Sequence, residues 1–212
     1  MNKAQRFWDK QAKRYDYSER QFESVFKEVV SKTKEYLNTS DVVMDFGCAT
    51  GTKTLELAEA SKHIRGIDIS DEMIKEATKK KNELKIMNAS FTQGNIFKND
   101  FEKASFDKII SYGVIHLLDD KEKVVQRIHE LLKPGGLFIS TTACLSDKMA
   151  FKNRLELSIY LIIKRLGIFP LHLNMFRTSD VEKLISSQKF TLVKTEKIFH
   201  GITINFIVAR KQ

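Results

Sequence analysis

Short apolar runs alternate with stretches of helical periodicity along most of the chain. Runs of this kind are typical of strands buried on both faces, and helices between them favour a parallel sheet with crossover connections. The runs predict strands at 42–46, 63–69, 90–94, 106–112 and 137–143. We therefore predict an α/β fold with a doubly wound, mostly parallel sheet.

Three helices carry a sequence signal for their first turn. The signal is a capping box, in which two side chains three positions apart bind each other's backbone amides. The pairs are Ser18 with Gln21, Asp119 with Glu122, and Ser179 with Glu182. The last two pairs predict helices over 119–132 and 179–188, and Pro134 with Gly135 forbids continuation of the first.

The C-terminal part of the chain departs from the alternation. Two β-rich runs, FTLVKTEKIF and GITINFIVARK, are separated by little more than His200 and Gly201. So short a connection predicts an antiparallel hairpin instead of another crossover. The complete prediction is a Rossmann-like sheet of seven strands with an antiparallel strand at its C-terminal end.

Two further segments stand outside the alternation. Residues 1–38 predict one or two helices that form an N-terminal cap, and residues 145–177 form a long helical insertion after the fifth strand. Both segments carry apolar faces beyond what the sheet needs, so both are candidates for a lid. We expect one domain over 1–212, because the chain is long enough for one sizeable core.

Composition limits the location of the protein. The N-terminal stretch is dense in charge and lacks the apolar region of a signal peptide. The longest uncharged apolar run, Leu157–Ile163, is far shorter than the roughly 20 residues that span a bilayer. The two cysteines, Cys48 and Cys144, form no CxxC motif or disulfide framework. These features predict a cytoplasmic protein.

The net charge is +9, from 36 Lys and Arg against 27 Asp and Glu. An excess of this size is compatible with nucleic acid, phospholipid or an acidic metabolite and does not choose among them. The basic residues are scattered over predicted helix faces, and no zinc finger or RNA-recognition pattern is present. Nucleic acid is therefore the less favoured partner.

The stretch DFGCATGTKT, which follows the first predicted strand, nearly matches a P-loop. Gly47, Lys53 and Thr54 occupy the first, seventh and eighth positions of that motif, but Thr52 replaces the glycine before the lysine. A P-loop needs that glycine to wrap backbone amides around phosphates, and the negative charge of Asp45 is unfavourable for a triphosphate. We therefore do not expect a triphosphate here.

A nucleoside fits this place in the sequence better. Gly47 and Gly51 match the spacing of a dinucleotide motif poorly, yet Asp68 ends the second predicted strand, where it can accept hydrogen bonds from both ribose hydroxyls. Because Asp45 and Asp68 are both anionic, a cationic nucleoside is favoured. Each carboxylate also has a structural alternative. Asp45 would cap the turn after the first strand, and Asp68 would pair with a surface lysine.

The same stretch, VVMDFGCATG, resembles the first motif of the class I methyltransferases that use S-adenosylmethionine. Four later stretches resemble the family's later motifs and follow in the same order. They are GIDIS with DEMIKEA, then QGNIF, FDKIISYGVIHLL and LLKPGGLF. The resemblance covers about residues 40–145. The stretch RFWDKQAKRYD resembles a cap found in the branch with ubiquinone-type and small-molecule methyltransferases. The resemblance implies a Rossmann-like methyltransferase with S-adenosylmethionine as its donor and no metal.

Carried over by position, the resemblance implies a set of donor-binding residues at the carboxyl ends of the strands. They are Tyr15, Asp45, Phe46, Gly47, Cys48, Gly51, Asp68, Ile69, Met73, Asn95, Ile96 and Tyr112. The ribose hydroxyls fall to Asp68 and the adenine lies between Ile69 and Ile96. The chain departs from the pattern at Asn95, where the family usually has Asp, and at Ala49, where it mostly has Gly.

Two residues are candidates for catalysis. Tyr112 follows the fourth strand and is expected near the sulfonium, and His116 lies within reach of the transfer site as a possible general base. A structural role for His116 is an equal alternative. Cys48 is expected to be a small buried residue instead of a nucleophile, and the other histidines show no metal-ligand spacing.

The insertion is the only guide to the methyl acceptor. Its apolar residues follow helical spacing with basic residues nearby, a pattern compatible with a hydrophobic acceptor pocket, a membrane-surface helix or simple core packing. The favoured prediction is methyl transfer to a small, apolar or lipid-like acceptor. The alternatives are an RNA methyltransferase that uses the basic surface, and a partner protein that binds the donor without catalysis.

Overall fold

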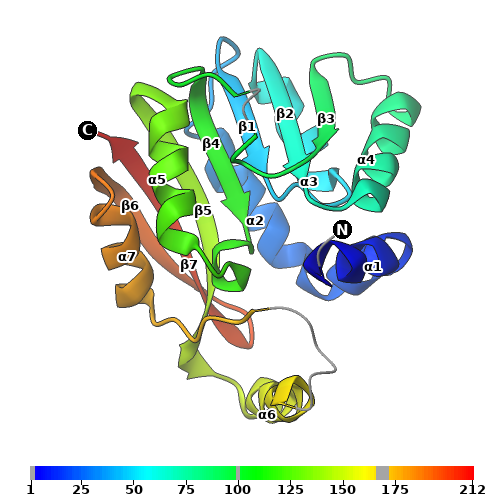
Figure 1. Ribbon diagram of the computed structural model, residues 1–212, viewed down its shortest axis with the longest axis vertical. Helices are drawn as coiled ribbons and strands as arrows, with labels where there is room; N and C mark the ends of the chain where they lie inside the picture. The colour runs from blue at the N-terminus through cyan, green and yellow to red at the C-terminus, as the bar shows by residue number, and fades with distance from the viewer. Residues whose placement is uncertain (1–2, 99–100, 166–171) are drawn as a thin grey trace.

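Seven strands form one sheet in the order β3-β2-β1-β4-β5-β7-β6 (Figure 1). The computed structural model describes residues 3–98, 101–165 and 172–212. The strands are β1 (Val42–Phe46), β2 (His63–Asp68), β3 (Ala89–Gln93), β4 (Phe106–Tyr112), β5 (Leu132–Met149), β6 (Phe190–Phe199) and β7 (Ile202–Lys211). Only β7 runs antiparallel to its neighbours, which confirms the predicted Rossmann-like sheet with its C-terminal hairpin.

Helices cover both faces of the sheet. They are α1 (Lys3–Glu19), α2 (Glu23–Lys34), α3 (Thr52–Leu57), α4 (Asp71–Glu83), α5 (Lys121–Leu131), α6 (Phe151–Arg165) and α7 (Thr178–Ser186), with short 3-10 helices η1 (Arg20–Phe22), η2 (Ala58–Ala60) and η3 (Ile115–Leu117). One core cluster holds residues of α5 and α7, and another holds residues of α2 and α3. The helices and strands therefore form a three-layer molecule, as crossover connections require.

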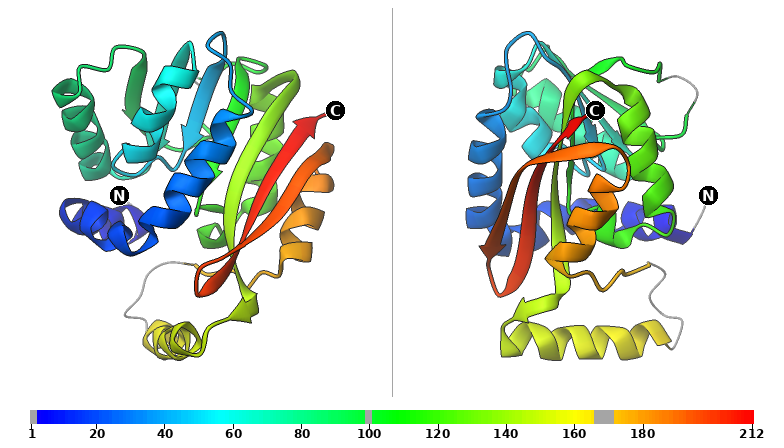
Figure 2. Two further views of the ribbon diagram at one scale, coloured as in Figure 1. Left: turned by 180° about the vertical axis from the view of Figure 1, so that it is seen from behind. Right: turned by 90° about the vertical axis from the view of Figure 1, so that its left-hand side faces the viewer.

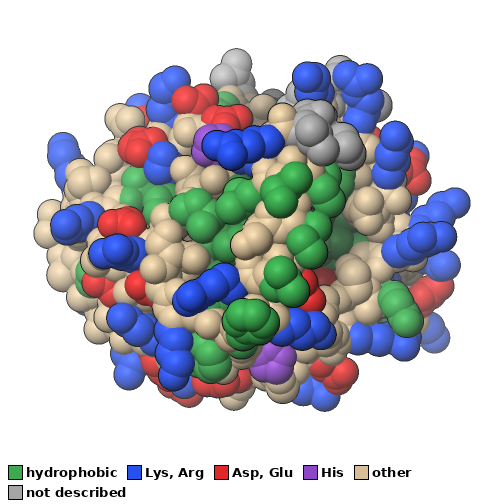
Figure 3. Space-filling view, turned by 90° about the horizontal axis from the view of Figure 1, so that it is seen from below, with side chains coloured by type: hydrophobic (Ala, Val, Ile, Leu, Met, Phe, Trp, Pro, Cys, Tyr) green, Lys and Arg blue, Asp and Glu red, His purple; other side chains and the backbone are tan. Residues whose placement is uncertain are grey.

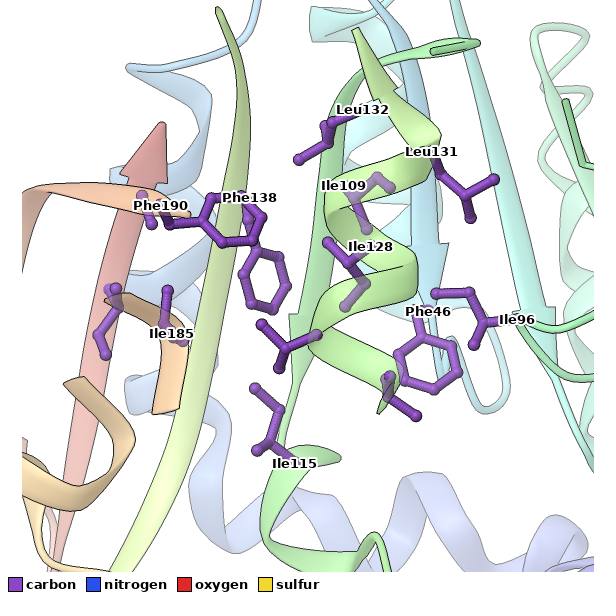
Figure 4. Packing of buried hydrophobic residues seen from close by; sticks show 14 of the residues in the cluster. Phe46, Ile96, Ile109, Ile115, Ile128, Leu131, Leu132, Phe138, Ile185 and Phe190 are labelled. Atoms are coloured by element: carbon purple, nitrogen blue, oxygen red, sulfur yellow. The ribbon is translucent and has the colours of Figure 1, made fainter. Parts of the chain in front are cut away.

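The strands alternate between these two clusters because successive side chains point to opposite faces. Ile109 of β4 and Phe138 of β5 belong to the cluster under α5, where Ile128 packs (Figure 4). Their neighbours Ile110 and Ile139 belong to the cluster under α2. This two-sided burial explains why the strands read as continuous apolar runs.

The three predicted capping boxes are wrong, although the helices exist. Helix α1 continues through Ser18, whose hydroxyl donates back to the Tyr15 carbonyl. The N-cap of α5 is Asp120, whose carboxylate accepts from the Lys123 ammonium and caps no backbone amide of the helix. For α7 the N-cap is Arg177, whose amide donates to the Asp180 carboxylate. The helix ends lie one or two residues from the sequence signals, a shift that local periodicity does not resolve.

Strand β5 is longer than its predicted span of 137–143. It begins directly after α5, passes through the KPGG stretch with a shift of register against β4, and continues to Met149. Its far end pairs with β7 at Cys144 and again at Met149, with a shift of register between them, and so projects beyond the parallel strands. This arm carries α6 away from the sheet, to one end of the molecule (Figure 2).

Candidate active site

The turn after β1 is shaped by two glycines with positive φ. Gly47 has φ +77° and Gly51 has φ +75°, and both Gly47 and Cys48 donate their amides to the Ile67 carbonyl of β2. A Cβ at position 47 would lie 2.4 Å from Val114 Cγ2. Glycine is therefore required by conformation and by packing, and the turn stays at the carboxyl end of β1 beside β4, where the strand order reverses.

Asp68 holds this turn to the next one. Its carboxylate accepts from the amide of Ala49 at 3.0 Å and from the amide of Ser70 at 2.9 Å. Burial raises the pKa of Asp68, while the two backbone hydrogen bonds oppose the rise. Each carboxylate oxygen keeps a further lone pair, so Asp68 can also accept from hydroxyls of a ligand.

Asp45 is a buried carboxylate at the end of the neighbouring strand. The Thr54 hydroxyl donates to it at 2.5 Å. Asp45 therefore ties the turn to α3, which agrees with the structural role in the turn that was the alternative to ligand binding. Burial raises the pKa of Asp45 to about 6, against the hydrogen bond from Thr54 and the charge of Lys53. Burial also raises the pKa of the Cys48 thiol, as expected for a small buried residue.

Lys53, which occupies the P-loop lysine position, points to the cap. It forms an ion pair with Glu19 at the end of α1, and its ammonium lies 3.8 Å from the centre of the Phe26 ring. The lysine is thus committed to contacts with the N-terminal segment.

The predicted adenine contacts lie beside β2 and β3. Ile96 is buried in the core cluster with Phe46, whereas Ile69 is half-buried. Asn95 is exposed, and its side-chain oxygen accepts from the amide of Phe97 at 2.9 Å. Met73 is buried in the first turn of α4. Asn95 is therefore the member of this group that reaches solvent most freely.

Helix α1 lies across the carboxyl ends of the strands and is bound there by two acidic residues (Figure 2). Asp9 accepts from the Ser70 hydroxyl at 2.7 Å. Asp16 accepts from the Thr50 hydroxyl at 2.5 Å and pairs with Lys80 of α4. The cap thus contacts the turns after both β1 and β2. No local pattern predicts these pairs, because they join positions 34 to 64 residues apart (Asp16 to Thr50 is 34 and Asp16 to Lys80 is 64).

A cavity of about 700 Å³ opens beside the end of β4. Its walls come from the cap, the ends of β4, β5 and β7, and α6. Most of the lining side chains are aromatic or aliphatic, among them Phe7, Trp8, Phe22, Leu145, Met149, Leu157, Tyr160 and Ile204. Such a chamber suits a small apolar molecule.

Tyr15, Tyr112 and His116, three of the predicted site residues, line this cavity. The Tyr112 hydroxyl donates to Thr33 of α2 at 2.6 Å, and burial raises its pKa. The pKa of Tyr15 is raised by burial and by its hydrogen bond to Glu19. Both hydroxyls therefore stay protonated near neutral pH.

His116 is the titratable group of η3. Burial lowers its pKa to about 4, so the ring is neutral near pH 7. Within the described part of the chain its buried Nδ1 atom has no hydrogen-bond partner. The structure brings His116 and Tyr112 to the cavity and Asp45 and Asp68 to the adjacent turns.

A family model described as a methyltransferase domain matches residues 37–189, which is more than half of the chain. The chain belongs to the class I S-adenosylmethionine-dependent methyltransferases. An uncharacterized methyltransferase of Geobacillus sp. (strain WCH70) is 28% identical over 86% of this methyltransferase and 87% of its own length. A demethylmenaquinone methyltransferase of Lactococcus lactis is 33% identical over 80% of this chain and 73% of its own length.

Solved structures share the fold of this methyltransferase. A protein of Pyrococcus horikoshii superposes with a TM-score of 0.72 at 22% identity, over 90% of this chain and 91% of that one. The phosphoethanolamine N-methyltransferase 2 of Haemonchus contortus, in complex with phosphomonomethylethanolamine and S-adenosylhomocysteine, has a TM-score of 0.71 at 16% identity. The superposition covers 87% of this chain and 52% of the Haemonchus contortus chain.

Among the described residues of the methyltransferase, no helix has the length and apolar character needed to cross a membrane. No group of three or more His, Cys, Asp or Glu among them is placed to hold a metal ion.

Proposed function

We propose that the methyltransferase moves a methyl group from S-adenosylmethionine to a small, largely apolar acceptor that binds in the cavity. The observation that carries the proposal is the cavity itself, which is walled mainly by aromatic and aliphatic side chains and opens at the end of β4. The likeness to a relative named for demethylmenaquinone agrees with an acceptor of this kind.

The residues at the strand ends fit the donor. Asp68 has lone pairs left for ribose hydroxyls, and the carboxylates of Asp45 and Asp68 together favour a cation over a phosphate chain. Gly47 and Gly51 give the turn its positive φ angles beside these carboxylates. When bound, S-adenosylmethionine supplies a methyl group already activated for displacement. The protein has to hold the acceptor in line with it, and alignment alone can be worth several kcal/mol.

The cap and α6 exclude water from the proposed transfer site. Trp8 and Tyr15 of α1 close the cavity on one side, and Leu157 and Tyr160 of α6 close it on another. His116 is the neutral group of this chamber that can take up a proton from the acceptor. Because its pKa is about 4, it suits an acceptor that gives up its proton readily.

The donor site is tested by calorimetric titration with S-adenosylmethionine, S-adenosylhomocysteine and ATP with magnesium. The wild type is expected to bind the first two and not ATP, and Asp68→Ala is expected to abolish binding. Asp107→Ala is the matched control, because Asp107 also accepts a backbone amide, from Val42, and lies at the opposite end of the strands. Binding of ATP alone would overturn the nucleoside site.

The acceptor is tested by transfer of a labelled methyl group into a cell extract that is then separated into lipid, RNA and small polar molecules. The label is expected in the solvent-extractable apolar fraction with the wild type and in no fraction with Asp68→Ala. Label in RNA would favour the RNA methyltransferase. Donor binding without any transfer would favour a partner protein that has no catalytic activity.

A further inference from the structure

Helix α6 exposes an apolar stripe to solvent. Phe151 is 84% exposed, Leu155 54%, Ile159 50% and Ile162 61%. None of the 15 residues of α6 is buried. Large apolar side chains gathered in one exposed patch usually mark a surface that contacts another molecule.

The stripe lies on the outer side of the helix. Residues at positions i, i+4, i+8 and i+11 share one face of an α-helix, which places these four side chains together. The opposite side of α6 carries Asn153, Leu157 and Tyr160, which line the cavity. The outer stripe is therefore not needed to close the cavity or to cover the sheet.

Basic residues flank the stripe. By helical position, Lys152 lies along one edge of it, and Arg154 and Arg165 lie along the other. The helix holds four cations, Lys152, Arg154, Lys164 and Arg165, against the single anion Glu156, a net charge of +3. Glu156 lines the cavity and also pairs with Lys152 at 3.9 Å, so the excess positive charge of the outer face lies mainly on the edge with Arg154 and Arg165.

The position of α6 leaves this face accessible. The extended end of β5 holds the helix at one end of the molecule (Figure 1). At its first turn, Ala150 donates its amide to the Gly201 carbonyl at the tip of the β6-β7 hairpin. Figure 3 looks onto this end of the molecule, where hydrophobic side chains gather in the middle and Lys and Arg side chains surround them.

We propose that the outer face of α6 docks the protein onto an anionic lipid bilayer. A helix with apolar side chains between Lys and Arg lies in the bilayer interface, where the apolar groups enter the headgroup region and the cations pair with lipid phosphates. A nucleic acid would leave the central apolar stripe unused. A second copy of α6 would bring the same cations against each other, which is unfavourable.

The docking itself does not depend on the reaction proposed above, but one consequence rests on it. The same helix separates the bilayer from the cavity, so an apolar acceptor dissolved in the membrane would enter the cavity beside Leu157 and Tyr160. Helix α6 would then act as the membrane contact and as a wall of the acceptor site.

Sedimentation with vesicles tests the docking without donor or acceptor. The probes are vesicles of phosphatidylglycerol and phosphatidylcholine in equal parts, and vesicles of phosphatidylcholine alone. We expect the wild type to bind the anionic vesicles more tightly, with an affinity that falls as salt rises. The double variant Phe151→Ser, Ile162→Ser should lose binding by about tenfold or more.

The chain offers matched controls for both parts of the face. Met87 is 86% exposed and Leu84 63%, on the loop after α4, so Leu84→Ser with Met87→Ser removes equal apolar exposure elsewhere and should leave binding unchanged. Arg154→Gln with Arg165→Gln should weaken binding on the order of tenfold. Lys79→Gln with Lys85→Gln removes the same number of positive charges from exposed positions of α4 and the loop after it. This variant should bind the vesicles as tightly as the wild type.

Three results would overturn the docking proposal. The first is vesicle binding by the α6 variants as tight as that of the wild type, and the second is an equal loss of vesicle binding in the control variants. The third is a homodimer, seen in sedimentation velocity, that dissociates in the Phe151→Ser, Ile162→Ser variant. Titration of S-adenosylhomocysteine without vesicles keeps the two proposals apart. Donor binding retained by the α6 variants shows that they are folded, whereas its absence in the wild type would overturn the donor site and leave the vesicle result standing.

Discussion

Ala49 holds a backbone conformation that residues with a side chain adopt rarely. Its φ is +48°, within the left-handed region, and its amide donates to Asp68. The family pattern has glycine here, and the structure shows why, since the turn demands a positive φ between two glycines that also have one. A Cβ in this region costs roughly 1 kcal/mol.

We expect Ala49→Gly to raise the free energy of unfolding by about 0.5–1 kcal/mol, because it removes that strain. It should also tighten S-adenosylhomocysteine binding, because a side chain beside Asp68 is lost. Ala104→Gly is the control, since Ala104 has φ +52° in a loop away from the turn. Both variants should be stabilised in thermal unfolding, but only Ala49→Gly should change donor affinity. A less stable Ala49→Gly protein would contradict the strain.

Asp45 illustrates a buried charge that costs stability. Its pKa is raised to about 6 in the folded protein, against about 3.9 when unfolded. A raised pKa stabilises the fold below about pH 4, and that contribution is lost as the pH rises through about 6. Above that pH the ionised carboxylate costs up to about 3 kcal/mol.

Asp45→Asn should therefore be more stable than the wild type above about pH 6, by up to about 3 kcal/mol, with the difference shrinking towards pH 4. Its amide oxygen can still accept from Thr54. Donor affinity should fall, because a negative charge near the sulfonium is lost. Urea unfolding at several pH values measures the difference, and comparison with the wild type cancels the opposite titration of His116. Asp41→Asn should instead be destabilised, since it leaves the Lys108 ion pair broken.

At the scale of elements, the cap behaves as a docked helix. The sequence predicted helices over residues 1–38 and an apolar face on the first of them, and both are present in α1 and α2. It did not predict where α1 lies, because its docking depends on Asp9 and Asp16 meeting turns that follow other strands. The capping boxes failed because the helices begin elsewhere: Arg177 and Asp180 cap α7, whereas the Asp120 side chain caps no amide of α5.

Asp9→Ala with Asp16→Ala should release α1 from the strand ends. Amide hydrogen exchange is expected to accelerate across Lys3–Glu19, and S-adenosylhomocysteine should dissociate several-fold faster because the cap opens more often. The control is Glu23→Ala, which removes the exposed ion pair between Glu23 and Lys27 in α2. It should change neither the exchange rate nor the dissociation rate, because exposed ion pairs contribute little. Unchanged exchange in the double variant would show that the apolar face alone holds the cap.

For the molecule as a whole, we expect donor binding to be linked to folding. The turns beside Asp45 and Asp68 join β1, β2 and α3 to the cap, so a donor bound at the proposed site would contact all of these elements. A ligand that binds only the folded state stabilises it by about 2.7 kcal/mol at a hundred times its Kd.

S-adenosylhomocysteine at that concentration should raise the unfolding temperature by roughly 5–10 °C for a chain of this size. The rise should follow the logarithm of ligand concentration and vanish in Asp68→Ala. Differential scanning calorimetry measures it, with adenosine monophosphate as a ligand that carries a phosphate in place of the homocysteine group. An equal shift with adenosine monophosphate would contradict the preference against phosphate at this site.

The layers of this protein could be predicted from its sequence. Continuous apolar runs and period-3.6 apolar patterns reflect burial of one strand or helix at a time, so they located β1 to β4, α5 and the hairpin from local information. The glycine turn and the carboxylates after β1 and β2 followed as well, because parallel strands bring their carboxyl ends to one edge.

Which segments of the chain meet across that edge could be learned only from the folded structure. The projecting end of β5, the docking of α1 and the two faces of α6 depend on pairings between distant segments, such as Met149 with Ile202. Local periodicity showed that α6 is apolar on several sides. It could not tell which side closes a cavity and which faces solvent, because that depends on where the rest of the chain lies.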